Sequence, residues 1–400
     1  MKQDRLHYLL SRCNIYYLNE LDRLQQNGRY KKIIGIEYIP KQLRGSEKRI
    51  KSFLILFGLL LPLFVLFCFF KATLSHARTK RIVYNSDYLF LLVSPALPRV
   101  VKRAELETEK GKWLLYPWKD NDCIPSESKL SVFSLLNLYD ILDSIVDYIR
   151  TYYYVWYKEG LNRVPLVIGS LNWFLYNSAL RHVSSDTNLI FCNHLDQLVV
   201  LIDKLPHRNK ILVQHGTEII LHNTFDIEAN FLNKSQQGFW TLNPPYQYHT
   251  ITEAYVFTKT EETALLLSIL GCHPKFHYTG YGLKLTDLNL EKKSVLIVGY
   301  YYIFIEIERK ILESLQDKGL VVFLKNHPTI PPSKYDSIKK EYDFELITDG
   351  TFPKVDLVIS YDSTLALEYE ALGVSVLYYD NINFSNKQTV EDAIRKGLLL

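Results

Sequence analysis

Short apolar runs separated by amphipathic segments repeat along the chain from residue 81 onward. The runs are rich in β-branched and large aliphatic residues, which is typical of strands buried in a parallel sheet. The segments between them place apolar residues at helical spacing. This alternation predicts βαβ units and therefore an α/β protein with parallel sheets. The predicted strands are 88–93, 165–169, 189–191, 210–213, 254–257, 295–298, 320–324, 345–347, 355–359 and 374–379, and the predicted helices are 128–158, 171–180, 195–204, 261–270 and 304–317.

The alternation is interrupted between residues 278 and 293, where a glycine-containing polar stretch follows Tyr278. Such a stretch is typical of a hinge. We therefore expect two Rossmann-like domains, 81–277 and 294–400, that face each other across a cleft. Ligands of open parallel sheets lie beyond the carboxyl ends of the strands, so the cleft is the expected site.

The first 80 residues follow a different pattern. Residues 3–26 repeat apolar positions at helical spacing, which predicts an amphipathic helix. Residues 53–70 form an uncharged apolar run interrupted only by Gly58 and Pro62, with basic residues on both sides. The run matches the length of a short membrane-spanning helix, but the basic residues on both sides indicate no orientation. Three interpretations stay open: a segment that lies in one leaflet or turns back at Pro62, a true span, and a buried core helix.

Overall charge and cysteine content exclude several classes of protein. The chain of 400 residues has 47 basic and 43 acidic residues and no basic stripe interleaved with aromatics, which argues against a nucleic-acid partner. Its five cysteines are scattered without a CxxC pair, which argues against a disulfide scaffold or a zinc site. We expect no metal, and Asp120-Asn121-Asp122 is too far in the sequence from the motifs below to serve as a DxD motif.

Polar residues that favour helix starts follow the strand at 355–359. Ser360-Tyr361-Asp362-Ser363-Thr364 precedes a short apolar-faced helix, and Gly373 is placed to end that helix. Hydroxyls and free backbone N–H groups at such a point can hold a phosphate. The alternative is an ordinarily capped helix.

Two other strand ends carry residues with chemistry. Gln214-His215-Gly216-Thr217-Glu218 follows one strand, and its imidazole can act as a base near neutral pH. Lys325-Asn326-His327-Pro328-Thr329 follows another, and Lys325 with His327 could clamp an anion. Each stretch could also be a turn without further chemistry.

These motifs, in this order, resemble those of bacterial GT-B-like transferases that build surface polymers. The group includes CDP-glycerol glycerophosphotransferases, sialyl- and polysialyltransferases and capsular polysaccharide enzymes. Gln214-His215-Gly216 resembles their HG element, and Lys325, His327 and Pro328 with Ser360, Ser363 and Thr364 resemble their HP and S-S/T motifs. The resemblance covers residues 82–400, and the acidic D/E-D/E-G triplet of the sialyltransferases is absent.

The resemblance implies a role for each domain. Residues 294–400 would bind a nucleotide-activated donor, CMP- or CDP-linked for preference, through the HP and S-S/T positions and Gly299. Residues 81–277 would bind the acceptor, with His215 near the reacting centre and Gly216, Thr217 and Glu218 on the acceptor side. Glu368 and Glu370, on the helix after Thr364, could contact the donor's ribose or sugar.

We therefore expect a glycosyltransferase that needs neither a metal nor a cofactor and transfers a sugar or polyol phosphate to a surface glycan or lipid-linked acceptor. Its expected place is the cytoplasmic face of a bacterial inner membrane, held by residues 53–70. Two alternatives remain. One is a nucleotide-sugar 2-epimerase of the same architecture, which would have no use for a membrane segment. The other is a non-catalytic, membrane-anchored assembly protein.

Overall fold

A computed structural model describes residues 47–82, 84, 86–93, 97–159, 170–192, 198–216, 249–268, 270–299, 305–327, 330–348, 350–361 and 363–399. The chain divides into two compact units, Met1–Thr279 and Gly280–Leu400, which are described separately below. The predicted helix at 3–26 and the predicted strand at 165–169 lie outside the described residues.

The first unit is built on a seven-stranded sheet in which every neighbouring pair is parallel. The strand order is β3-β2-β1-β4-β5-β6-β7, so the chain order reverses direction between β1 and β4. In open parallel sheets this reversal creates a crevice at the carboxyl ends of the two strands. The strands are β1 (Tyr88–Leu92), β2 (Gly111–Leu115), β3 (Lys129–Ser131), β4 (Asn188–Phe191), β5 (Lys210–Val213), β6 (Glu253–Val256) and β7 (Lys275–Tyr278).

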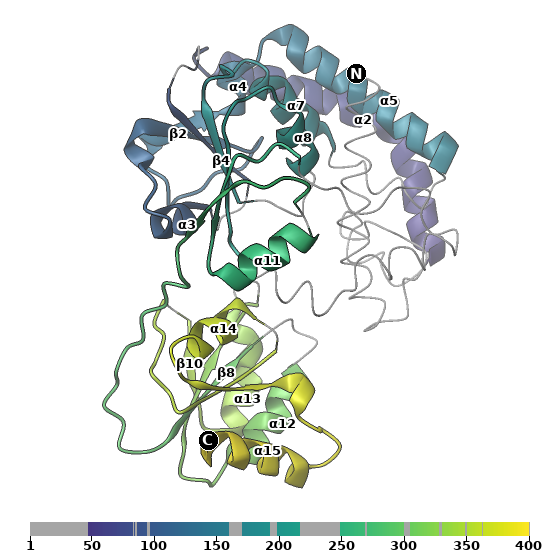
Figure 1. Cartoon of the computed structure of the whole chain (residues 1–400). Helices are drawn as coiled ribbons and strands as arrows, with labels where there is room; N and C mark the ends of the chain where they lie inside the picture. Colours follow the sequence, from purple (N-terminus) through teal and green to yellow (C-terminus); the bar gives the residue numbers. More distant parts are fainter. Residues whose placement is uncertain are drawn as a thin grey trace. The chain divides into compact units, whose positions relative to one another are not determined.

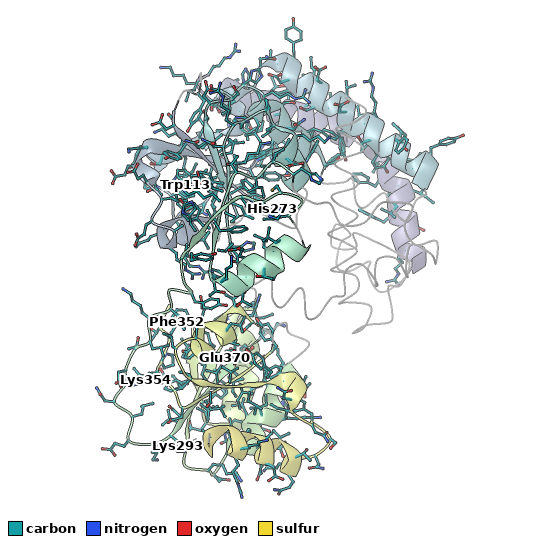
Figure 2. All side chains as sticks on the ribbon, viewed as in Figure 1. Trp113, His273, Lys293, Phe352, Lys354 and Glu370 are labelled. Carbon is teal, nitrogen blue, oxygen red and sulfur yellow. The ribbon has the colours of Figure 1, made fainter. Side chains whose placement is uncertain are left out.

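Helices cover both faces of this sheet (Figure 1). Leu89 and Leu91 of β1 face one core, whereas Phe90, which stacks on Trp113 (labelled in Figure 2), faces the other. This division follows from the two-residue side-chain period of a strand. The first core contains residues of α4 (Val132–Leu135), α5 (Leu138–Glu159), α7 (Ser170–Leu180), α8 (Leu198–Lys204) and α11 (Lys259–Ser268), and the second contains α3 (Leu97–Arg103).

The apolar run at 53–70 lies within one long helix, α2 (Glu47–Ala77). Of the interpretations left open, a chain that turns back at Pro62 is wrong, because α2 continues through that residue. By length and composition, Ser52–Ala77 could cross a membrane, although a buried core helix can meet the same criteria. One side of α2 packs on α5, where the Phe57 and Tyr152 rings lie 6.0 Å apart and Gly58 lies against Trp156. α2 therefore contributes to the core of the first unit.

The second unit is built on a five-stranded parallel sheet of order β10-β9-β8-β11-β12. Its chain order reverses between β8 and β11. The strands are β8 (Ser294–Val298), β9 (Val321–Lys325), β10 (Glu345–Ile347), β11 (Leu357–Ser360) and β12 (Ser375–Tyr378). α12 (Ile305–Leu315), α13 (Asp336–Glu341) and α15 (Lys387–Leu399) contribute to the core on one face, and α14 (Thr364–Glu370) to the core on the other.

The boundary between the units falls close to the predicted hinge. β7 extends to Tyr278, so the first sheet reaches into the predicted hinge region. Thr286 forms a parallel bridge to Pro353 and exchanges backbone hydrogen bonds with Phe352 and Lys354. This pairing attaches the stretch after Gly280 to the second unit.

Three strands were not predicted from the sequence: β2, β3 and β7. β3 is only three residues long, and β2 and β7 contain lysine or histidine that weakens the apolar signal. β3 and β7 form the two edges of the sheet, where polar residues are tolerated.

Candidate functional site

One row of residues crosses the carboxyl edge of the second sheet. In register, Ile347, Lys325, Val298, Ser360 and Tyr378 lie side by side on β10, β9, β8, β11 and β12. Adjacent strands are about 4.8 Å apart, so Lys325 and Ser360 are separated by about 10 Å. The fold thus places two of the predicted phosphate-binding stretches beside the reversal between β8 and β11.

Gly299 follows β8 at this edge. Its N–H donates to the carbonyl oxygen of Lys325 at 2.8 Å. A Cβ atom at this position would lie 2.8 Å from Tyr335 Oη and 3.2 Å from Glu308 Oε1. Only glycine therefore fits here without displacing its neighbours, and Gly299 is required by close packing.

Ser363 caps α14, as the sequence predicts. Its Oγ accepts a hydrogen bond from Ala366 N–H at 3.0 Å and lies 3.0 Å from Ser360 Oγ. Both serines are buried, so their hydroxyls are directed to each other and to the helix start. Thr364, the first residue of α14, is partly exposed and offers its side chain at the surface. Gly373 has a φ of 80°, the left-handed conformation expected of a glycine that ends a helix.

Lys325 and His327 lie at the end of β9 and are both partly buried. Lys325 Nζ is 5.0 Å from the ring centroid of Phe352, which is labelled in Figure 2. Burial lowers the pKa of His327 below its usual value, which favours the neutral imidazole. Asn326 holds the turn, because its side-chain amide donates to the Ile330 carbonyl at 2.8 Å. Pro328 lies outside the described residues.

A buried acidic and tyrosine cluster, comprising Glu308, Tyr335 and Tyr379, lies next to Gly299. Glu308 of α12 is fully buried, and Tyr379 Oη donates to the Val298 carbonyl at 3.0 Å. Burial and the neighbouring Glu308 carboxylate raise the pKa values of both tyrosines well above their ordinary value, so both stay protonated. None of these three residues was among the predicted site residues. The available signal was that Glu308 lies in phase with the buried Ile311, Leu312 and Leu315 of its helix.

Glu368 and Glu370 of α14 have different environments. Glu368 is buried, whereas Glu370 is exposed and accepts a hydrogen bond from Tyr378 Oη at 3.3 Å. Figure 2 labels Glu370 on the second unit. Of the two, Glu370 has its side chain at the surface.

In the first unit, His215 follows β5 and is partly buried. The preceding Gln214 is buried and connects three segments. Its Nε2 donates to Glu261 Oε2 at 2.7 Å, its Oε1 accepts from Phe257 N–H at 3.0 Å, and its backbone N–H donates to the Tyr255 carbonyl at 2.9 Å. Glu261, which was not among the predicted site residues, lies in the first turn of α11. Gln214 therefore fixes the backbone from which His215 projects.

The other acceptor-side predictions are only partly described. Gly216 is partly buried, and Thr217 and Glu218 lie outside the described residues. Asp120 is exposed and pairs with Lys129 at 2.7 Å. Within the described ranges, no group of three or more His, Cys, Asp or Glu side chains is placed to hold a metal ion.

Comparison of the sequence with known proteins does not assign this chain to a family. No protein-family model matches the chain, and no curated protein matches it. The class that the structure itself defines is an α/β protein with a seven-stranded and a five-stranded parallel sheet and an apolar N-terminal helix.

Proposed function

We propose that this protein is a GT-B-like glycosyltransferase that transfers a sugar or polyol phosphate from a nucleotide-activated donor to a surface glycan or lipid-linked acceptor. The observation that carries the proposal is the edge formed by Gly299, Lys325, Ser360, Ser363 and Thr364, beside the strand reversal of the second sheet. Parallel sheets bind nucleotides at such reversals. In the proposal, the two units face each other across the donor and acceptor.

On the donor side, the leaving nucleotide phosphate would be stabilised by positive charge and by N–H donors. Lys325 supplies the charge. The first N–H groups of a helix have no partner within it. Ser363 accepts from Ala366, so among the described residues no side chain caps the N–H groups of Thr364 and Leu365, which would face the ligand. The Thr364 hydroxyl lies at the same helix start. Such donors accelerate a reaction when they bind the developing charge more strongly than the substrate.

On the acceptor side, His215 would act as the base. It takes the proton from the acceptor hydroxyl, whose oxygen forms a bond to the donor carbon or phosphorus. The bond to the nucleotide phosphate breaks, and its electron pair leaves with that phosphate. The Gln214–Glu261 hydrogen bond would hold His215 in position for this step.

One observation favours a non-catalytic alternative. The Ser360 and Ser363 hydroxyls form a hydrogen bond with each other and do not face outward. Such mutual bonding is expected of a helix start that only caps the helix and binds no ligand. Under that alternative the protein would assemble or regulate a glycan machinery without binding a donor.

Nucleotide binding distinguishes the two. Thermal unfolding of the full chain would be measured with CMP, CDP, UDP and GDP, and again for Lys325→Gln. The transferase is supported if at least one nucleotide stabilises the protein and this stabilisation is lost in Lys325→Gln. The control variant Lys339→Gln, at an exposed position of α13, should keep the stabilisation. Absence of stabilisation by all four contradicts it.

A further inference from the structure

The exposed face of α2 is apolar along most of the helix. The opposite side of α2 is buried in the first unit at Leu54, Leu61, Cys68 and Ala72, which recur at intervals of seven and four residues and so lie on one side of the helix. Large apolar side chains remain exposed on the other side, with Leu59 at 71% and Phe70 at 69% exposure. The exposed set is Ile55, Leu56, Leu59, Leu60, Leu63, Leu66, Phe67, Phe70 and Leu74. An apolar face of this extent marks an interaction surface.

The packing of α2 is compatible with a helix in the plane of a membrane rather than across it. α2 lies against α5, which carries Asp140, Asp143, Asp147 and Arg150. If α2 crossed the bilayer in this packing, these charges would enter hydrocarbon at a cost of about 3 kcal/mol each. A helix that lies flat buries only its exposed face, about 5–10 Å deep.

The exposed apolar face ends in a positive charge. Leu74 is the last exposed large apolar residue of α2. Arg78 is the first residue after the helix, and its backbone N–H donates to the Leu74 carbonyl at 3.1 Å. Arg78, Lys80 and Arg81 are all exposed. Basic residues at the end of an apolar face meet the anionic headgroups of a membrane.

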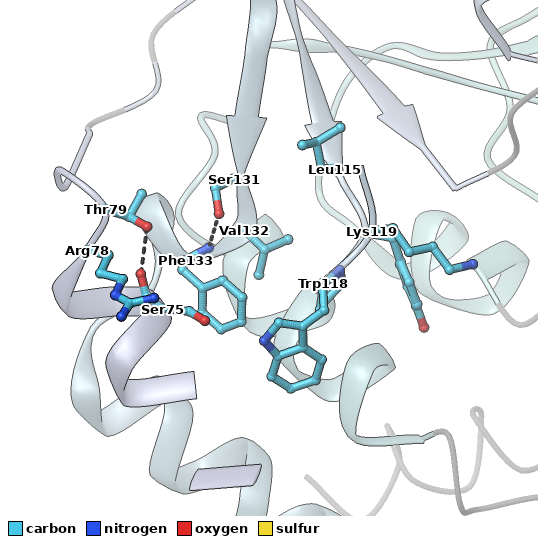
Figure 3. A pocket seen from close by; sticks show the side chains of 11 residues that line it. Ser75, Arg78, Thr79, Leu115, Trp118, Lys119, Ser131, Val132 and Phe133 are labelled. Carbon is cyan, nitrogen blue, oxygen red and sulfur yellow. Dashed lines mark hydrogen bonds between the residues drawn. The ribbon is translucent and has the colours of Figure 1, made fainter. Parts of the chain in front are cut away.

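Arg78 also lines a pocket of about 280 Å³ (Figure 3). The pocket lies between the C-terminal end of α2 and the carboxyl ends of β2 and β3, with Leu115 and Ser131 as the last residues of those strands. Among the described residues, its lining includes Arg78 and Lys119 and no carboxylate. The volume is just below the range of about 300–1,000 Å³ typical of drug-sized ligands, so it suits a headgroup rather than a whole lipid.

Trp118 adds two unusual features to this pocket. Its φ is 56°, a left-handed conformation that is uncommon for a large side chain and that clusters at functional sites. Its indole Nε1 is buried and has no hydrogen-bond partner among the described residues. A third cation is close, because Lys71 Nζ lies 4.6 Å from the Trp118 ring centroid.

We propose that this pocket binds the phosphate headgroup of an anionic membrane lipid whose acyl chains lie against the exposed face of α2. Arg78 joins the two parts, since it directly follows α2 and lines the pocket. Arginine suits the role because its guanidinium can donate two parallel hydrogen bonds to one phosphate. Such a site would exist whether or not the protein transfers a sugar.

The test is binding of the full chain to vesicles of phosphatidylcholine, with or without phosphatidylglycerol, measured by flotation. We expect a preference for the anionic vesicles. The double variant Arg78→Gln/Lys119→Gln should weaken binding to them about 10–30-fold, since each basic residue near the surface contributes about 1 kcal/mol. The matched control Lys339→Gln/Lys340→Gln removes the same charge from α13 and should change binding less than about twofold.

Three results would overturn the proposal. Equal losses in the two double variants would indicate attraction by net charge alone. If the unmodified protein shows no preference for anionic vesicles, an anionic lipid headgroup is not the ligand of the pocket. Binding of soluble glycerol phosphate that is tighter than binding to anionic vesicles, and that is lost in Arg78→Gln/Lys119→Gln, would assign the pocket to a free phosphate. The thermal unfolding temperature of each variant is measured as a control. A value unchanged from that of the parent protein shows that weaker vesicle binding does not result from unfolding.

Discussion

The hydroxyl oxygens of Ser360 and Ser363 lie 3.0 Å apart at the carboxyl edge of the second sheet, and both side chains are buried. Ser363 also caps α14, whereas the neighbouring Thr364, the first residue of that helix, is partly exposed. The cap and the proposed phosphate site can therefore be separated by mutation.

Ser363→Ala should lower the free energy of unfolding by about 1 kcal/mol, because the cap at Ala366 N–H is lost. Thr364→Ala should leave stability within about 0.5 kcal/mol. It should weaken nucleotide binding about tenfold or more, since a hydrogen bond to a charged group contributes about 1.5–3 kcal/mol. Denaturant unfolding and calorimetric titration measure the two quantities. Unchanged nucleotide affinity in Thr364→Ala would remove this residue from the site.

Gly299→Ala should destabilise the protein by about 1–3 kcal/mol, because the added methyl group meets Tyr335 Oη at 2.8 Å. Removing that hydroxyl relieves the nearest contact, so the cost should be smaller in a Tyr335→Phe background. A double-mutant cycle by denaturant unfolding gives the coupling. If Gly299→Ala destabilises the parent protein and the Tyr335→Phe variant equally, the Tyr335 hydroxyl is not the group that excludes a side chain at position 299.

His215→Ala should reduce turnover about 10²–10⁴-fold, the usual contribution of a general base, while donor affinity changes only a few-fold. His273→Ala, an exposed histidine of the same unit labelled in Figure 2, is the matched control and should keep full turnover. Steady-state kinetics and donor binding give the two effects. A collapse of donor binding in His215→Ala would make it a binding residue instead.

Acid should destabilise the first unit through His207. Burial, with the nearby Lys210 charge, lowers its pKa from 6.5 to about 4. Between these values the unfolded chain binds a proton that the folded chain does not, so stability is lost as pH falls from 6.5 towards 4. The loss is about 3 kcal/mol. Denaturant unfolding at a series of pH values should show a smaller loss of stability with acid in His207→Gln. The control variant His273→Gln should show the same pH dependence of stability as the parent protein.

The in-plane placement of α2 predicts that both ends stay on the same side of a membrane. Cysteine reporters at Ser52 and Lys80, both exposed, would be placed in a chain whose native cysteines are replaced by serine. Once this protein is bound to the outside of sealed vesicles, an impermeant maleimide should label both reporters fully. Protection of one reporter would instead indicate a helix that crosses the bilayer.

Features that depend on a few neighbouring residues could be read from the amino-acid sequence alone. The apolar runs predicted every interior strand of both sheets except β2, Ser363 predicted the start of α14, and Gly373 predicted its end. These signals are local, because strand burial, helix capping and a left-handed glycine depend on residues close in the chain.

Which residues lie next to one another depends on packing between distant parts of the chain. The register that places Lys325 and Ser360 in one row depends on strands paired from distant parts of the chain. The burial of Glu308 beside Gly299 depends on how α12 packs on β8. α2 is the clearest example, because it is apolar on all sides and its sequence cannot say which side faces α5. Only packing assigned one side to the core and left the other exposed.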